Sequence, residues 1–130
     1  MILLDTHVVV WLAGDTGKIS TKAARAISEA RKDRVGLAIS ALTLFELAHL
    51  VVRKRIQVDL SLDLFLHDVE SRFVVRPLNA LIAAKATQLP NPFPKDPIDR
   101  IIVATAIVEE LPLVTADERI QKSRTIRTVW

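Results

Sequence analysis

Short apolar runs and amphipathic stretches alternate along this chain. Four runs lack polar alternation, which is typical of strands covered on both faces, and a fifth segment is predicted as an edge strand. These five segments are residues 1–4, 35–39, 73–75, 113–115 and 126–130. Between them, helical spacing and N-cap residues predict helices over 6–13, 20–31, 40–54, 59–71, 79–88, 96–110 and 116–121. This alternation predicts an α/β fold with a parallel sheet covered by helices on both sides.

Length and composition narrow the class of protein. A chain of 130 residues predicts a single domain over 1–130, and a hydrophobic fraction of 50% provides a core. The absence of cysteine excludes disulfides, thiolate zinc sites and thiol nucleophiles. The apolar runs are too short to span a bilayer and no basic region precedes the first one, so we expect a cytoplasmic protein without a membrane segment. The net charge of +3 suits a polyanion or an acidic partner, and equally an ordinary solvated surface.

Four acids occupy positions that carboxylates normally avoid. Asp5, Glu46, Asp99 and Asp117 lie inside or directly after apolar runs, where an unpaired buried charge costs many kcal/mol. No cationic side chain accompanies Asp5 or Asp117 in sequence, so a metal cation is the economical partner. Because sites in parallel sheets form beyond the carboxyl ends of the strands, Asp5 and Asp117 are expected to meet.

Each acid also has a purely structural interpretation. Asp5 follows a strand and precedes a helix, so it could serve only as a cap, and Glu46 could reach solvent from the edge of its helix. The segment Asp96-Pro97-Ile98-Asp99 resembles a capping box, as does 115–118 around Asp117. The functional interpretation gains weight from the four acids taken together.

A carboxylate cluster without cysteine selects Mg²⁺ or Mn²⁺ over zinc. Such ions lower the pKa of a bound water and stabilise charge on an attacked phosphate, which is phosphoryl chemistry. The histidines fit this site less well. His7 is near enough to Asp5 to touch the site, whereas His49 and His67 are assigned to structure.

The order of these motifs resembles the PIN-domain family, and within it the VapC-type ribonuclease toxins of toxin–antitoxin modules. No single matching segment is decisive, but their order and separation in a chain of this length are specific. The matching segments are Leu3-Leu4-Asp5-Thr6-His7, Ser40 to Ala48 around Glu46, Asp96-Pro97-Ile98-Asp99-Arg100 followed by Val103-Ala104-Thr105-Ala106, and Leu113-Val114-Thr115-Ala116-Asp117 before a Val129-Trp130 ending.

The resemblance implies a three-layer α/β/α sandwich and a Mg²⁺- or Mn²⁺-dependent endoribonuclease that acts as a toxin, in which a metal-activated water attacks an RNA phosphodiester. Carried over by position, the catalytic acids are Asp5, Glu46, Asp99 and Asp117, with Asp5, Asp99 and Asp117 holding metal. Supporting roles fall to Thr6, Thr115, Asp96 and Arg100.

Two of these supporting roles remain open in the resemblance. Asp96 either assists the metal or only caps its helix, and Arg100 contacts either a phosphate or a neighbouring acid. Thr115 would orient Asp117 or a water. The implied partners are an RNA substrate, a small antitoxin protein and a second copy of the chain.

Three other classes compete with the nuclease interpretation. A catalytically silent PIN-like module that binds RNA or protein would share the fold, although all four acids are present. A receiver-type phosphoacceptor domain would need adjacent acids after the first strand, where Asp5 stands alone. A dinucleotide-binding fold is disfavoured because only three glycines exist and none forms a phosphate-binding run.

Overall fold

Five parallel strands form one sheet through the middle of the protein, in the order β3-β2-β1-β4-β5. The strands are β1 (Ile2–Leu4), β2 (Leu37–Ser40), β3 (Val74–Arg76), β4 (Leu113–Val114) and β5 (Thr128–Val129). The structure, a computed structural model, describes residues 1–130. All five strands lie where the apolar runs predict them, and β5 occupies an edge as expected.

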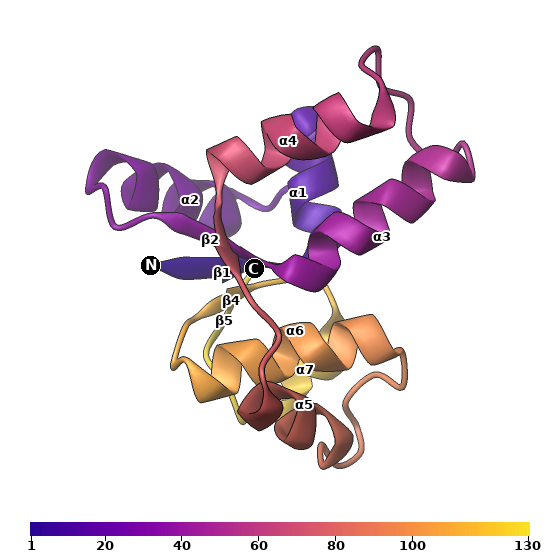
Figure 1. The fold of residues 1–130 in the computed structure, drawn as a ribbon. Helices are drawn as coiled ribbons and strands as arrows, with labels where there is room; N and C mark the ends of the chain where they lie inside the picture. The colour runs from indigo at the N-terminus through magenta and orange to yellow at the C-terminus, as the bar shows by residue number, and fades with distance from the viewer.

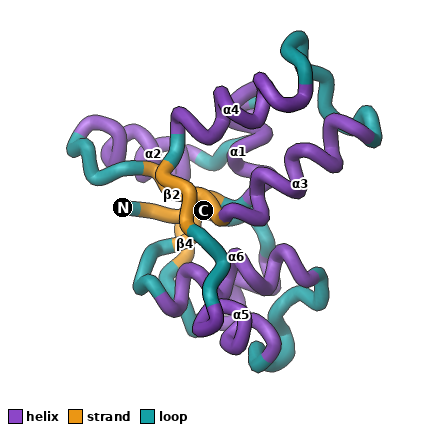
Figure 2. The backbone as a smooth tube through the Cα atoms, in the orientation of Figure 1, coloured by secondary structure: helices purple, strands orange, loops and turns teal.

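Helices cover both faces of this sheet. One layer contains α1 (Thr6–Ala13), α2 (Thr21–Lys32), α3 (Ala41–Val52) and α4 (Leu62–Arg72), and the other contains α5 (Ala80–Thr87), α6 (Pro97–Val108) and α7 (Glu118–Ser123). Figure 1 shows the first layer above the sheet and the second below it, and Figure 2 shows the strands between them. The three-layer α/β/α sandwich is therefore confirmed. No helix here has both the length and the apolarity needed to cross a bilayer.

Alternating strand residues divide the core into two halves. Leu3 and Leu113 are fully buried against residues of α6 and α7, whereas their neighbours Leu4 and Val114 are fully buried against the α1 to α4 layer. Successive side chains of a strand point to opposite faces, so a strand covered on both sides must be apolar at every position. This requirement explains why the strands appear in the sequence as short uninterrupted apolar runs.

N-cap side chains fix most of the helix starts. Ser20, Ser40, Asn79 and Asp96 each accept a hydrogen bond from a backbone N–H in the first turn of the following helix, as the sequence predicts. The last helix differs from its prediction. It begins at Glu118 rather than at residue 116, because the Asp117 side chain takes the N-cap position.

The strand order places the end of β1, where Asp5 lies, at the centre of the sheet. β1 lies between β2 and β4, and the chain crosses from one side of β1 to the other. The N–H of Asp5 donates to the carbonyl of Val114 at 3.0 Å, so the residues following β1 and β4 leave the sheet side by side. This is the switch point at which parallel sheets bind ligands.

Arg100 fastens the loop between α5 and α6 to the second helical layer. Its Nε donates to the carbonyl of Ala86 at 2.9 Å, Nη1 to that of Pro94 at 3.1 Å and Nη2 to that of Leu89 at 2.6 Å. Neither role left open by the resemblance matches these contacts, because all three donors face backbone carbonyls. The guanidinium satisfies the end of α5 and the proline-rich loop, which lack regular hydrogen bonds of their own.

We expect Arg100→Lys to lower the free energy of unfolding by about 2–4 kcal/mol, because an ammonium cannot reach three separate carbonyls in a planar array. Urea unfolding measures the change. The control is Arg72→Lys, which alters an exposed pair with Asp68 within α4 and should cost at most about 1 kcal/mol. Equal losses in the two variants would contradict a clamping role for Arg100.

Candidate metal centre

Asp5 is the most buried of the predicted acids, with only 2% of its surface exposed. It forms the N-cap of α1, where its Oδ1 accepts from the N–H of Thr6 at 2.8 Å. The hydroxyl of Thr115 donates to its Oδ2 at 2.7 Å. Both oxygens therefore have donors, which makes a carboxylate tolerable at this depth.

Thr115 links the ends of β1 and β4. Its hydroxyl oxygen also accepts from the N–H of Asp117 at 3.1 Å, while Asp117 Oδ1 caps α7 by accepting from the N–H groups of Arg119 and Ile120. The expected meeting of Asp5 and Asp117 is thus mediated by a single threonine. The resemblance implies that Thr115 orients Asp117 or a water, whereas the shortest hydrogen bond of its hydroxyl is to the carboxylate of Asp5.

Side chains of α1 also connect the region around Asp5 to α3 and to the end of β4. The hydroxyls of Thr6 and Thr43 lie 3.1 Å apart and join α1 to α3, and both residues are buried. The N–H of Ala116 donates to His7 Nε2 at 3.2 Å, so the imidazole proton faces Asp5 from Nδ1, 3.7 Å from Oδ2. His7 therefore touches the site. Thr43 was missed by sequence reasoning, because a buried threonine in an apolar helix has no distinguishing pattern.

Glu46 projects from α3 toward this region and is partly buried. Burial raises its pKa above the usual value, and the nearby carboxylates of Asp5 and Asp96 add to the effect, whereas a hydrogen bond from Thr6 opposes it. The apolar face of α3 thus presents a carboxylate to other carboxylates.

Asp99 is the acid most strongly affected by its surroundings. Burial raises its pKa to about 7, with further contributions from the carboxylates of Asp5, Asp96, Glu46 and Asp117, in that order. Every other acid of the group acts on Asp99, which identifies it as the centre of the cluster.

Asp96 combines a structural contact with a place in the cluster. Its Oδ1 accepts from the N–H groups of Ile98 and Asp99 at 2.9 and 3.2 Å, which makes it the N-cap of α6. Glu46, Asp96 and Asp99 can each offer a carboxylate oxygen within 4.8 Å of the others. The metal set carried over from the resemblance, Asp5, Asp99 and Asp117, shares only Asp99 with this closely spaced group.

The five carboxylates fit a divalent cation. No lysine or arginine forms an ion pair with any of them, and the donors are oxygens alone apart from His7 beside Asp5. Burial and then the neighbouring carboxylates raise the pKa of Asp99, and no cationic side chain opposes this shift. Carboxylate oxygens at this spacing are suitable ligands for hard ions such as Mg²⁺ and Mn²⁺.

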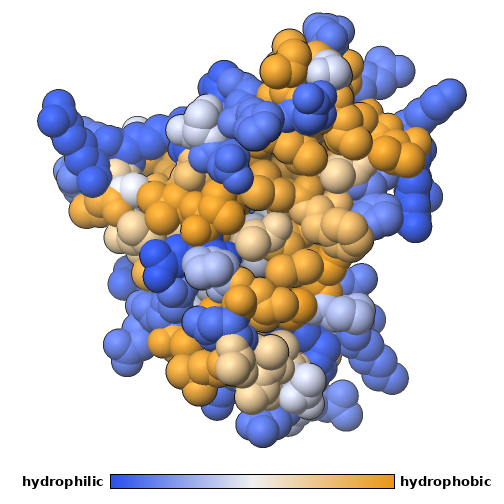
Figure 3. Space-filling view, in the orientation of Figure 1, coloured by the Kyte–Doolittle hydropathy of each residue, from blue (hydrophilic) through white to orange (hydrophobic).

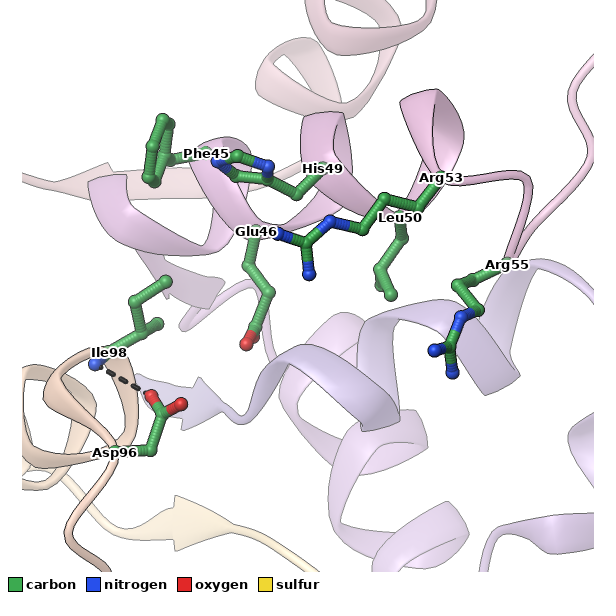
Figure 4. Close-up of a pocket in the computed structure, with 8 residues that line it drawn as sticks. All are labelled: Phe45, Glu46, His49, Leu50, Arg53, Arg55, Asp96 and Ile98. Atoms are coloured by element: carbon green, nitrogen blue, oxygen red, sulfur yellow. Dashed lines mark hydrogen bonds between the residues drawn. The ribbon is translucent and has the colours of Figure 1, made fainter.

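The cluster opens into a cleft of about 380 Å³ between α3 and the start of α6. Figure 4 shows Glu46 and Asp96 approaching each other across the cleft from opposite helical layers, with Arg53 and Arg55 along one side of it. A smaller adjoining hollow of about 300 Å³ reaches Asp5 and Asp99. The site is therefore open to a ligand that approaches between the two helical layers.

Comparisons with known proteins agree with this geometry. A family model described as "PIN domain" matches residues 2–124. Over 131 aligned positions, the chain is 37% identical to Ribonuclease VapC22 of Mycobacterium tuberculosis (strain ATCC 25618 / H37Rv), covering 99% of this chain and 98% of that protein.

Two solved structures share the fold at low sequence identity. VapBC2 from Rickettsia felis, bound to a DNA fragment from its promoter, superposes with a TM-score of 0.72 at 20% identity, covering 98% of this chain and 97% of that one. DNA-bound VapBC from Salmonella typhimurium superposes with a TM-score of 0.70 at 19% identity, covering 98% and 97%.

The five carboxylates predict that the metal-free protein becomes less stable as the pH rises, because the pKa of Asp99 is higher in the folded state than in the unfolded chain. The folded state holds a proton on Asp99 up to a pKa of about 7, whereas the unfolded chain releases it near 3.8. The proton therefore stabilises the folded state fully below pH 3.8, and this contribution is lost as the pH rises to the folded-state pKa of about 7.

In EDTA, we therefore expect the melting temperature of the wild type, relative to Asp99→Asn, to fall between about pH 4 and about pH 7 and to level off above that. Thermal melts of both proteins measure this difference, and excess Mn²⁺ should restore the wild type at the higher pH. Asp33→Asn, which neutralises an exposed acid at the end of α2, is the control and should follow the wild type. Parallel curves for the wild type and Asp99→Asn would contradict the central position of Asp99.

Proposed function

This chain belongs to the PIN-domain family, and from that membership we propose that it is a divalent-metal-dependent endoribonuclease, the toxin of a toxin–antitoxin pair. The observation that carries the proposal is the gathering of five carboxylates without a cationic partner at the switch point of the sheet, where Glu46 and Asp96 line an open cleft. A relative named as a ribonuclease, at 37% identity over nearly the full length, supports the reaction class. The whole of 1–130 is proposed to act as one nuclease domain, since strands from both ends of the chain complete the sheet.

Asp99 is proposed as the central metal ligand, because it belongs both to the set implied by the resemblance and to the closely spaced group with Glu46 and Asp96. Asp5 and Asp117 supply further negative charge from the ends of β1 and β4. When bound, Mg²⁺ or Mn²⁺ supplies a water of lowered pKa and stabilises charge on the attacked phosphate. The protein's own contribution is to gather these carboxylates beside the cleft.

The hydrogen bonds around Asp5 support its place in the site. Donors from Thr6 and Thr115 fix the carboxylate in one orientation. A threonine at 115 thus positions the acid rather than reacting itself. Preorganisation of this kind removes a cost that substrate binding would otherwise have to meet.

We expect Asp99→Asn and Asp5→Asn to reduce cleavage of single-stranded RNA by about 10³-fold, equivalent to about 4 kcal/mol of transition-state stabilisation. Asp96→Asn should be milder, about tenfold, because an asparagine oxygen still caps α6 and still faces the cleft. Initial rates in Mg²⁺, in Mn²⁺ and in EDTA measure these effects, with Asp33→Asn as the control.

Wild-type rates in Asp99→Asn would remove the basis for the site. A reversed order, in which Asp96→Asn abolishes cleavage and Asp99→Asn does not, would transfer the central role to Asp96. If the wild type cleaves no RNA with either metal, the chain is a silent PIN-like binding module.

A small antitoxin and a second copy of the chain are the proposed protein partners, and the cytoplasm, where RNA is available, is the proposed location. Part of α3 supports an interface, because Val52 is 66% exposed on a helix whose other apolar stripe already packs in the core. Figure 3 shows apolar side chains in a band across one face of the molecule.

Light scattering should give a mass of twice 14.5 kDa for the isolated chain. The exposed apolar area should be covered in such a dimer, so Val52→Asp is expected to shift the mass toward the monomer, because it places a charge in the buried patch. Asp63→Asn, on an exposed part of α4, is the control substitution. A wild type that remains monomeric at high concentration would contradict the dimer.

A further inference from the structure

Two arginines line the same cleft as the carboxylates without being paired to them. Arg53 is the C-cap of α3 and Arg55 follows two residues later, and both are exposed. Neither side chain takes part in an ion pair or a hydrogen bond within the protein, although Glu46 and Asp96 line the same cleft. Figure 4 shows both guanidinium groups on the Glu46 side of the opening. Their charge is therefore available to a ligand.

The backbone that carries these arginines is fixed. The N–H groups of Arg53, Lys54 and Arg55 donate to carbonyls of the last turn of α3 at 2.9, 3.0 and 2.8 Å. Lys54 adopts a left-handed conformation, with φ of 58°, which is unusual for a residue with a side chain. This turn brings Arg53 and Arg55 to the cleft, whereas Lys54 between them is not part of its lining.

The same helix, α3, also lines this cleft with aromatic rings. Phe45 is 56% exposed, and its ring meets that of His49 edge to face at a centroid distance of 4.5 Å. Exposed rings beside cationic side chains are typical of surfaces that bind single-stranded nucleic acid, where bases stack on rings and phosphates meet cations. An acidic protein segment would use the arginines but would have no need of the rings.

The positive charge of Arg53 and Arg55 offsets the negative charge of the acids in the cleft. A polyanion that enters this cleft meets the carboxylates of Glu46 and Asp96, with Asp5 and Asp99 in the adjoining hollow, so it requires positive charge close to the point of entry. Arg100, in the segment Asp96-Pro97-Ile98-Asp99-Arg100, cannot supply this charge, because its guanidinium donates hydrogen bonds to three backbone carbonyls. The guanidinium fork matches a phosphate group with two parallel hydrogen bonds.

We propose that Arg53 and Arg55 bind backbone phosphates of single-stranded RNA next to the phosphate that is cleaved. The proposal rests on the nuclease function proposed above and assigns a binding role to residues outside the acidic cluster. These arginines hold the strand across the cleft, so their contribution is to substrate affinity rather than to the chemical step.

The first test is steady-state cleavage of a single-stranded RNA by the wild type and by Arg53→Gln/Arg55→Gln over a series of salt concentrations. The double variant should raise KM about tenfold and change kcat less than about threefold, because it removes ground-state contacts. Lys22→Gln/Arg25→Gln, which removes two exposed charges from α2, is the matched control and should leave KM within about twofold. Arg53→Lys/Arg55→Lys retains the charge but not the guanidinium fork, so it should recover only part of the lost affinity.

The second test measures binding without cleavage. In an Asp99→Asn background, fluorescence anisotropy of a labelled single-stranded RNA reports Kd as salt is varied. Removing both arginines should weaken binding and lower the slope of log K against log salt by about 0.7 for each lost phosphate contact. Thermal melts with Mn²⁺ should be unchanged by the arginine substitutions, which shows that the metal site is intact.

Unchanged KM and salt slope in the double variant would overturn the proposal while leaving the nuclease function in place. If the wild type cleaves no RNA, the nuclease function fails, and the anisotropy measurement then decides the phosphate site alone. Loss of antitoxin binding with unaltered RNA affinity would likewise overturn the proposal and assign the arginines to the protein partner.

Discussion

Repulsion among five carboxylates gathered at one end of the sheet is the constraint on which much of this structure depends. Burial and then the proximity of the other carboxylates raise the pKa of Asp99 to about 7, so the folded protein carries an energetic cost at neutral pH that the protein alone does not remove. The two helical layers and the short strands bring these groups together, and the hydrophobic core must supply the stability that the cluster lowers. A site of this kind fits the general finding that functional residues are not optimised for stability.

The protein limits this cost by placing carboxylates at helix N-termini. Asp5, Asp96 and Asp117 are the N-caps of α1, α6 and α7, so each has an oxygen bonded to backbone N–H groups at the positive end of a helix. The structural and functional interpretations of these acids are therefore not alternatives. At Asp96, one oxygen caps the helix while the carboxylate also belongs to the closely spaced group with Glu46 and Asp99.

The sequence predicted most of the fold because strands buried on both faces leave an unmistakable apolar run, and because most helices begin at a residue with a capping side chain. Helix ends were harder to place. After α2, α3 and α6 the chain turns through left-handed residues that are not glycine, Arg34, Lys54 and Glu110, so the usual glycine signal is missing.

Parts of the site were hidden for a different reason. The partner of the Thr115 hydroxyl, Asp5, lies 110 residues away, and the partners of Arg100 are loop carbonyls, which have no sequence identity to recognise. The approach of Asp96 to Glu46 depends on how two helices from opposite layers face each other across the cleft. Sequence patterns report local periodicity and strand ends, but not the meeting of side chains between layers.

The distribution of charge also explains how one cleft can receive both a cation and a polyanion. With five acids gathered at the site, eighteen lysines and arginines face only ten other acids over the rest of the chain, so the remaining surface is strongly basic. That surface attracts RNA over a distance set by ionic strength, whereas the acidic floor repels it at short range until a divalent cation is bound. Each ligand thus lowers the electrostatic cost of the other, and linkage requires that RNA increase metal affinity by the same factor by which the metal increases RNA affinity. At Asp99, the proposed metal ligand, protons would compete with the metal, so both affinities should weaken as the pH falls below the pKa of about 7.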